Sequence, residues 1–164
     1  MRILVTGGLG FIGSALIRKL IDSTEYNILN LDACTYAAMP EALENREKVE
    51  RYQFKKIDIA DYDLVKDAIY QFQPNTIFHL AAESHVDRSI ENPAAFINTN
   101  ISGTFNILQS IKVCRDSLPD DFTLVHVSTD EVFGTLSFEG QPFDESSAYK
   151  PNSPYSASKA GSDL

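Results

Sequence analysis

Two kinds of apolar pattern alternate along the chain. Short runs of mainly apolar, often β-branched residues predict strands, which we expect at residues 2–6, 27–32, 52–57, 76–82 and 122–128. Longer stretches with apolar side chains every three or four positions, or rich in helix-forming residues, predict helices. These are expected at residues 11–22, 40–49 and 96–113, from a cap at Asp61 to Phe72, and from Ser153 and Pro154 onward. Gly, Pro, Asp and Ser residues predict a loop at 134–154.

This alternation restricts the fold class. Strands that alternate with helices are joined by right-handed crossovers into a parallel sheet. The strand expected at residues 76–82 is nearly all apolar, which is typical of a strand covered by helices on both faces. We therefore expect an α/β fold with a doubly wound parallel sheet. At 164 residues, the chain has the length of one domain.

Composition narrows the range of partners. The net charge of −9, from 14 basic and 23 acidic residues, argues against nucleic-acid binding by a broad basic face. No apolar run approaches the roughly 20 residues of a membrane helix, and the first residues do not resemble a signal peptide. Cys34 and Cys114 are too few for a disulfide framework and lack the spacing of a metal site. We expect a cytoplasmic protein that binds no metal and no membrane.

A glycine cluster follows the first expected strand. Gly7, Gly10 and Gly13 have the spacing GxxGxxG, which differs from the standard GxGxxG dinucleotide fingerprint but serves the same purposes. The first glycine permits a tight turn, the second lets the backbone approach a pyrophosphate, and the third allows close packing of the helix on the strand. The N–H groups at the start of the helix can then bind the phosphates.

An acidic residue follows at the spacing that such a site requires. Asp32 ends the second expected strand, where its carboxylate can accept hydrogen bonds from the ribose hydroxyls of adenosine. It would also repel a 2′-phosphate, so we expect NAD rather than NADP. Residues 1–164 are thus expected to form a Rossmann-like NAD-binding domain. A glycine-rich turn without a ligand is the alternative, and the helix and acid-ended strand that follow argue against it.

Tyr155 and Lys159 form the pattern YxxxK. On a helix this spacing puts both side chains on one face. An ammonium beside the phenol would lower the pKa of Tyr155, so that it could accept a proton near neutral pH. Any ordinary helix face can carry this pattern, and it gains weight only from the glycine cluster upstream.

Two adjacent acids, Asp130 and Glu131, follow the fifth expected strand. Ligands of doubly wound sheets bind outside the carboxyl ends of the strands, where these acids lie. Two carboxyl groups can divide acid and base roles when their environments separate their pKa values. Elimination of water from a sugar needs one group to remove a carbon-bound proton and another to protonate the departing hydroxyl. A solvated acidic turn is the alternative.

Together, these motifs resemble the extended branch of the short-chain dehydrogenase/reductase superfamily, which acts on nucleotide sugars. The resemblance rests on TGGLGFIG at residues 6–13, Asp32, Asp58-Ile59, Leu80-Ala81-Ala82 and YxxxK. It implies that NAD is contacted by the glycines and by Phe11, Ile12, Asp32, Ala33, Cys34, Thr35, Asp58, Ile59, Leu80, Ala81, Ala82, Glu83, Ser84, Thr99, Tyr155 and Lys159.

Within that branch, Thr129-Asp130-Glu131 and AESHVDRSI at residues 82–90 resemble the dTDP-glucose 4,6-dehydratase family. This resemblance implies that the substrate-binding residues include Ser84, His85 and Thr129.

The family reaction assigns a role to each catalytic residue. Tyr155, assisted by Lys159, takes the proton of the glucose 4-hydroxyl while hydride passes from C4 to NAD. Glu131 then removes the C5 proton, and Asp130 protonates the departing 6-hydroxyl. Thr129 bonds the sugar near O4, and hydride returns to C6 to give dTDP-4-keto-6-deoxy-glucose.

The resemblance also implies a longer protein, in which the remaining half forms a substrate-binding lobe. We therefore expect this chain to be the part that precedes that lobe and to be inactive by itself. A homodimer is implied, with its seam formed by the helix at residues 96–113 and the Tyr–Lys helix. One alternative is a nucleotide-sugar epimerase of the same branch, which would not need the acid pair. Another is an NAD-binding module without turnover.

Overall fold

The computed structural model describes residues 1–46, 48–138 and 140–164. They form two compact units, of which the first comprises Met1–Ala81 and Phe105–Val127. The second unit comprises Ala82–Thr104 and Ser128–Leu164.

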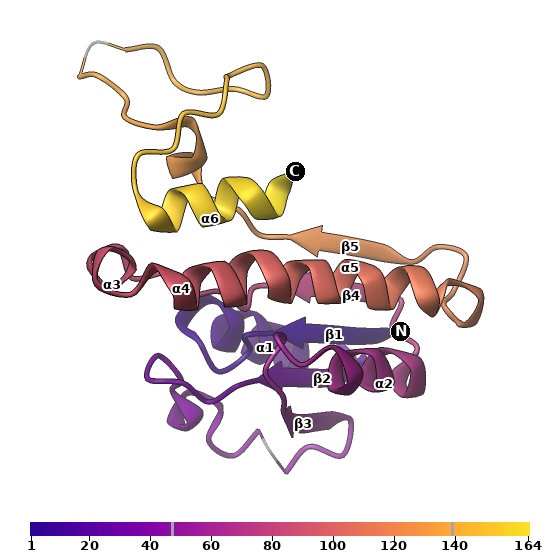
Figure 1. Ribbon diagram of the computed structural model, residues 1–164. Helices are drawn as coiled ribbons and strands as arrows, with labels where there is room; N and C mark the ends of the chain where they lie inside the picture. The colour runs from indigo at the N-terminus through magenta and orange to yellow at the C-terminus, as the bar shows by residue number, and fades with distance from the viewer. Residues whose placement is uncertain (47, 139) are drawn as a thin grey trace. The chain divides into compact units, whose positions relative to one another are not determined.

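The first unit is built on a five-stranded parallel sheet with the strand order β3-β2-β1-β4-β5 (Figure 1). The strands are β1 (Arg2–Thr6), β2 (Asn27–Asp32), β3 (Tyr52–Lys56), β4 (Thr76–His79) and β5 (Thr123–His126). The order reverses between β1 and β4, which is where doubly wound sheets bind ligands at their carboxyl ends. The predicted fold class is confirmed.

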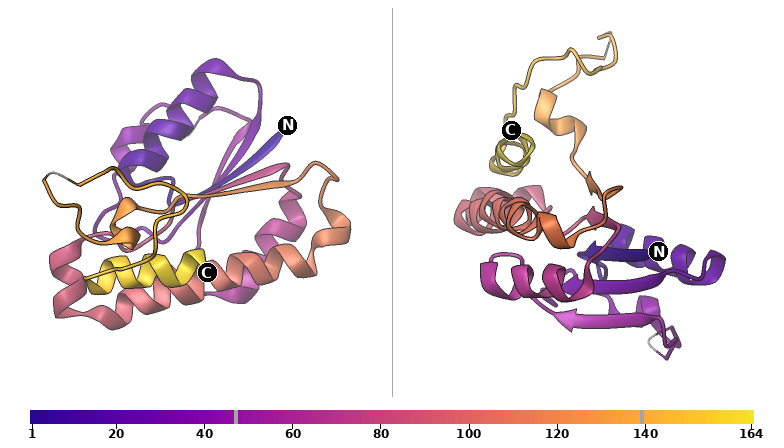
Figure 2. Two further views of the ribbon diagram at one scale, coloured as in Figure 1. Left: turned by 90° about the horizontal axis from the view of Figure 1, so that it is seen from above. Right: turned by 90° about the vertical axis from the view of Figure 1, so that its right-hand side faces the viewer.

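Helices cover both faces of this sheet. Helix α1 (Phe11–Ser23) lies on one face, and α2 (Tyr62–Phe72) and α5 (Thr104–Val113) lie on the other (Figure 2). Because successive side chains of a strand point to opposite faces, β1 supplies both cores. Leu4 packs in the cluster that contains residues of α2 and α5, whereas Ile3 and Val5 pack in the cluster that contains residues of α1. This explains why the middle residues of β1 are apolar on both faces.

The second unit is mainly helical. It contains α3 (Val86–Glu91), α4 (Pro93–Phe96), the π-helical η2 (Ile97–Gly103), the 3-10 helix η4 (Asp130–Phe133) and α6 (Pro154–Asp163). Helix α6 packs closely on η2, since a Cβ added at Gly161 would lie 3.1 Å from Cδ1 of Ile101. The Tyr155 ring meets the Phe96 ring edge to face, with 6.4 Å between the ring centroids.

Two helices begin at the capping residues that the sequence predicts. The Asp61 side chain accepts a hydrogen bond from the backbone N–H of Leu64, as expected of a cap for α2. Ser153 and Ser156 form a reciprocal capping box at the start of α6, with both N–H···Oγ distances at 3.0 Å. Short polar side chains that precede an apolar or small-residue run therefore locate these two helices correctly.

Three predicted elements need correction. The helix expected at 40–49 is only the 3-10 turn η1 (Pro40–Leu43), because Glu44 leaves the helical conformation with a ψ of 135° and Asn45 follows with a left-handed φ of 67°. Glu47, within that range, lies outside the described residues. The strand expected to reach residue 82 ends at His79, since the N–H of Ala81 donates to the side-chain hydroxyl of Thr6, 3.2 Å away, rather than to a backbone carbonyl of a neighbouring strand.

The third correction concerns the long helix expected at 96–113. Helical structure already begins at Pro93, and residues 97–103 form the π-helix η2. Helix α3 and the short 3-10 helices η3 (Arg115–Ser117) and η4 were not predicted. Among the described residues, the model has no helix with both the length and the apolar character needed to span a bilayer.

Candidate functional site

The turn after β1 requires glycine at several positions. Gly7 has a φ of 71°, and a Cβ there would lie 2.7 Å from the Cα of Ala81. A Cβ on Gly13 would overlap the Gly7 carbonyl oxygen, so this glycine permits packing on the turn rather than on the strand. Gly8, which the spacing does not single out, is just as confined, because a Cβ would overlap Oδ1 of Asn30. Gly10 is the N-cap of α1.

The start of α1 is suited to an anionic group. Gly10 supplies no capping side chain, and the first turn carries no acidic residue. Phe11 and Ile12 are 82% and 61% exposed, although both are large and apolar. Backbone N–H groups at a helix start bind phosphates through hydrogen bonds and the helix dipole. The cradle therefore fits the phosphates of a dinucleotide.

Asp32 ends β2 and is buried. Its Oδ2 accepts a hydrogen bond from the N–H of Leu9 at 2.9 Å, and its Oδ1 accepts one from the N–H of Cys34 at 2.8 Å. Asp32 thus joins the glycine turn to the segment after β2, where Ala33 is half-buried and Thr35 exposed. Each carboxylate oxygen has a further lone pair. The carboxylate can therefore still accept a ribose hydroxyl.

The remaining predicted NAD contacts of the first unit follow β3 and β4. Asp58 is exposed, and its Oδ1 accepts a hydrogen bond from the N–H of Ala60. The side chain of Ile59 lies in the core, so a contact from this residue is limited to its backbone. Leu80 is fixed by a bond from its N–H to the carbonyl of Thr6, which places it and Ala81 at the carboxyl end of β1.

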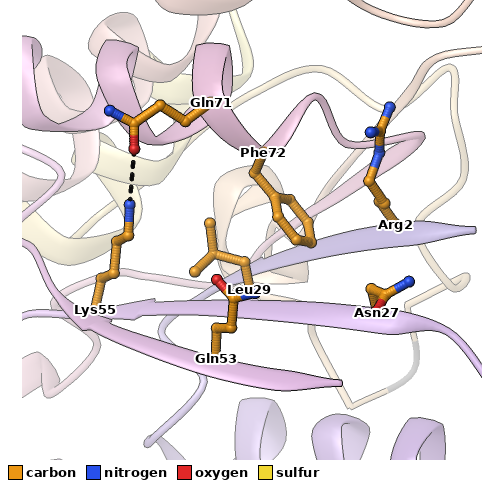
Figure 3. A pocket seen from close by; sticks show the side chains of 7 residues that line it. All are labelled: Arg2, Asn27, Leu29, Gln53, Lys55, Gln71 and Phe72. Atoms are coloured by element: carbon orange, nitrogen blue, oxygen red, sulfur yellow. Dashed lines mark hydrogen bonds between the residues drawn. The ribbon is translucent and has the colours of Figure 1, made fainter. Parts of the chain in front are cut away.

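A pocket of the first unit lies away from these residues (Figure 3). Its lining includes Arg2 and Asn27, the first residues of β1 and β2, and Phe72, the last residue of α2. The Lys55 ammonium at its rim donates to Oε1 of Gln71. None of the predicted site residues lines it. Because doubly wound sheets bind ligands at the carboxyl ends of their strands, this pocket is not the candidate site.

The second unit brings together four of the predicted catalytic residues. Thr129 caps η4, and its Oγ1 accepts a hydrogen bond from the N–H of Glu131 at 3.3 Å. The Thr129 hydroxyl donates to Oδ1 of Asp130 at 3.5 Å. The Thr129 side chain and the charges of Asp130 and Glu131 all influence the pKa of Tyr155, so the electrostatic effect of this turn reaches the tyrosine.

Electrostatics at Tyr155 differ from the sequence-based expectation. Burial raises the pKa of Tyr155, the negative charges of Glu131 and Asp130 raise it further, and the hydrogen bond to Thr129 opposes them. Lys159 is only 5% exposed, and burial lowers its pKa, against the opposing effect of Asp163. The expectation that Lys159 lowers the pKa of Tyr155 is wrong for this structure, because burial and the two carboxylates dominate.

Asn100 is a functional candidate that sequence reasoning missed. Its side chain is buried in η2, at 1% exposure. Oδ1 accepts from the N–H of Glu83 at 2.8 Å, and Nδ2 donates to the Glu83 carbonyl and to Oγ of Ser158, both at 2.9 Å. Asn100 thereby fixes the segment after β4 to the helix that carries Tyr155. An amide among the apolar positions of a helix was the available signal.

The segment that Asn100 holds contains the other predicted contacts. Ala82 and Glu83 are half-buried, whereas Ser84 and His85 are exposed, and His85 caps α3. Thr99 is half-buried beside Asn100 in η2. The exposed side chains are free of the core and available to a ligand.

Comparison with known proteins establishes the family. A model of the GDP-mannose 4,6 dehydratase family matches residues 4–164. The chain belongs to this family. One relative within it, the dTDP-glucose 4,6-dehydratase of Haemophilus influenzae, is 49% identical over 166 residues, a match that covers 99% of this chain and 49% of that protein. The chain thus spans about half the length of the curated relatives it matches.

Solved structures show the same relationship. The dTDP-glucose 4,6-dehydratase of Streptomyces venezuelae, crystallised with NAD, is 42% identical, with a TM-score of 0.88 over 99% of this chain and 49% of that one. The UDP-glucose 4-epimerase of Thermus thermophilus, also crystallised with NAD, is 30% identical, with a TM-score of 0.84 over 99% of this chain and 49% of that one. The family fold therefore accompanies both dehydratases and epimerases.

Proposed function

We propose that this chain is the NAD-binding part of a dTDP-glucose 4,6-dehydratase, a hydro-lyase that converts dTDP-glucose to dTDP-4-keto-6-deoxy-glucose and water. The observation that carries the proposal is the pair of carboxylates, Asp130 and Glu131, that act on the Tyr155 hydroxyl. Proteins 49% and 48% identical to the chain have this activity in their names.

The glycine turn and Asp32 fit NAD. The uncapped start of α1 would bind the diphosphate, and the Asp32 carboxylate would bind the adenosine ribose. Asp58 and the segment Ala33–Thr35 would border the adenosine half. When bound, NAD accepts hydride from the sugar and returns it within the same catalytic cycle.

The acid–base groups would work in a fixed order. Tyr155 accepts the proton of the 4-hydroxyl, and the ammonium of Lys159 favours the phenolate once substrate and cofactor have displaced water. Glu131 removes the C5 proton, which a ketone at C4 makes acidic. Asp130 protonates the 6-hydroxyl as it leaves.

Substrate contacts complete the site. The Thr129 hydroxyl would bind the sugar near O4, and its influence on the pKa of Tyr155 supports this role. Ser84 and His85 present exposed polar groups to the nucleotide sugar.

The test uses the full-length gene product with dTDP-glucose. The wild-type protein is expected to release the 4-keto-6-deoxy sugar, identified by mass spectrometry. Glu131→Gln should block elimination but spare the first oxidation, so that the absorbance of reduced cofactor builds up with substrate. An intact Tyr155 with no such build-up would show that Glu131 is not the C5 base.

An epimerase is the second candidate, since the Thermus thermophilus epimerase matches 99% of this chain. An epimerase inverts C4 and has no use for acids at positions 130 and 131. A sugar product that retains its 6-hydroxyl, formed equally fast by Asp130→Asn and Glu131→Gln, would favour it. Binding of NAD without conversion of any nucleotide sugar by the full-length protein would instead indicate a binding module.

We further propose that the protein is a homodimer. Phe105 and Leu108 of α5 are 61% and 47% exposed. Large apolar side chains exposed on successive helical turns are typical of a helix that packs against another chain.

A further inference from the structure

Asp163, at the end of α6, has a role that the sequence motifs do not assign. Its Oδ2 accepts hydrogen bonds from Oγ of Ser128 at 2.5 Å and from the hydroxyl of Tyr149 at 3.2 Å. Both donors come from outside α6. A carboxylate that accepts two hydroxyl groups is a directional anchor, because hydrogen bonds to charged groups are stronger than neutral ones. Both bonds lie at the exposed surface, where water weakens them.

The two donors lie at either end of the segment that carries the acid pair. Ser128 immediately precedes Thr129, which caps η4 by accepting the N–H of Glu131. Tyr149 lies at the other end and packs edge to face on Phe133, the last residue of η4, with 5.4 Å between the ring centroids. Asp163 therefore fixes this segment to α6 both before and after η4.

Asp163 also lies one helical turn after Lys159. Residues four apart on a helix share one face, and a buried ammonium such as that of Lys159 is costly without a nearby negative charge. The charge of Asp163 raises the pKa of Lys159 against the effect of burial. One carboxylate thus acts on both the turn that carries the acids and the lysine of the YxxxK pattern.

We infer that Asp163 is a positioning residue that holds the Thr129–Glu131 turn in register with Tyr155 and Lys159. The effect on turnover rests on the proposed dehydratase function, whereas the effect on the turn does not. Asp163 does not touch the reacting atoms. It acts through Ser128 and Tyr149, so loss of either bond should reproduce part of its effect.

The first experiment needs no substrate. Hydrogen exchange of the full-length protein, followed by mass spectrometry, compares Asp163→Asn with wild type and with Asp120→Asn, an exposed acid of the first unit. Loss of about one charge-assisted bond should speed exchange in residues 129–134 about tenfold, while residues 2–6 exchange at the wild-type rate. Ser128→Ala and Tyr149→Phe, which each remove one donor, should give smaller increases. Unchanged exchange in residues 129–134, or an equal increase throughout the chain, would overturn the inference.

The second experiment measures turnover of dTDP-glucose. Asp163→Asn should lower kcat about 10- to 100-fold, with little change in KM, because misplacement of catalytic groups affects the chemical step. Adding Ser128→Ala to Asp163→Ala should cost no further activity, since both remove the bond between Ser128 and Asp163. A wild-type kcat in Asp163→Asn, or fully additive losses, would contradict the inference. Failure of the wild-type protein to form product would refute the proposed function, and the exchange result would then decide the inference.

Discussion

Asp32 shows how one side chain can serve both the fold and the choice of cofactor. Its two oxygens already accept the N–H groups of Leu9 and Cys34. Asp32→Ala should therefore weaken binding of both NAD and NADP, because the turn loses its anchor. The difference between the affinities for NAD and NADP should also become smaller, since repulsion of the 2′-phosphate disappears.

Calorimetry on the wild type, Asp32→Ala and Asp32→Asn separates these effects. Asp32→Asn retains one acceptor oxygen and removes the charge. It should therefore reduce the preference for NAD over NADP but lower the affinity for NAD less than Asp32→Ala does. Equal affinity of the wild-type protein for NAD and NADP would contradict the assignment.

The raised pKa of Tyr155 predicts the pH range in which its phenol ionises. Without ligand, this phenol should ionise above the ordinary tyrosine range near pH 10. Since the folded-state pKa is raised, the associated stability is present below the unfolded-state pKa and is lost as pH rises through the folded-state pKa. Glu131→Gln should lower the pKa of Tyr155, because it removes one of the negative charges that raise it.

A spectrophotometric titration of wild type minus Tyr155→Phe isolates this one phenol. The same difference is then measured in the Glu131→Gln background. An ionisation below pH 10 in the protein without ligand would show that Lys159 outweighs burial and the carboxylates.

The sequence predicted candidate residues that form motifs of short spacing, and it missed residues that act through bonds to distant parts of the chain. Thr129, Asp130 and Glu131 are consecutive, and Tyr155 and Lys159 are four residues apart, so their spacing alone singled them out as candidates. Asn100 was missed because its partner Glu83 lies 17 residues away. No spacing rule reveals such a bond.

At the scale of elements, the capping box of α6 positions the helix that carries Tyr155. Ser153→Ala removes the Oγ that accepts the N–H of Ser156, and N-cap losses of this kind cost about 1 kcal/mol. Urea unfolding should show that decrease with an unchanged m-value. Ser153→Asp should restore most of the lost stability, since aspartate caps helices well. A decrease below about 0.3 kcal/mol in Ser153→Ala would show that tertiary packing alone holds the helix.

Strands were easier to predict than irregular helices. The bounds of β1 and β2 agree with the sequence because both strands are mainly apolar, Gly7 follows β1 directly, and Asp32 ends β2. The π-helical turn η2 could not be predicted, because its apolar spacing is also that of an ordinary helix. The prediction of a helix at 40–49 was wrong for a different reason. The composition favours a helix, but the left-handed conformation of Asn45 is incompatible with one.

At the scale of the whole molecule, α5 provides the test of assembly. The full-length protein should sediment as a dimer. Phe105→Glu combined with Leu108→Glu should shift it toward monomer, since charges would be buried at the seam. Tyr70→Glu is a matched control, because Tyr70 on α2 is as exposed as Phe105, at 61%. If Tyr70→Glu dissociates the dimer to the same extent, then added negative charge anywhere on the surface, and not the position on α5, explains the effect.

The position of β3 at the end of the strand order has a consequence for solubility. Among the described residues, no strand pairs with its outer side, so its backbone N–H and C=O groups form an open edge (Figure 1). Such an edge invites strands of other molecules and starts aggregation. Lys55 and Lys56 lie on β3, and stacking a second copy of this strand alongside would bring like charges together. The two lysines therefore disfavour edge-to-edge pairing of folded copies through β3.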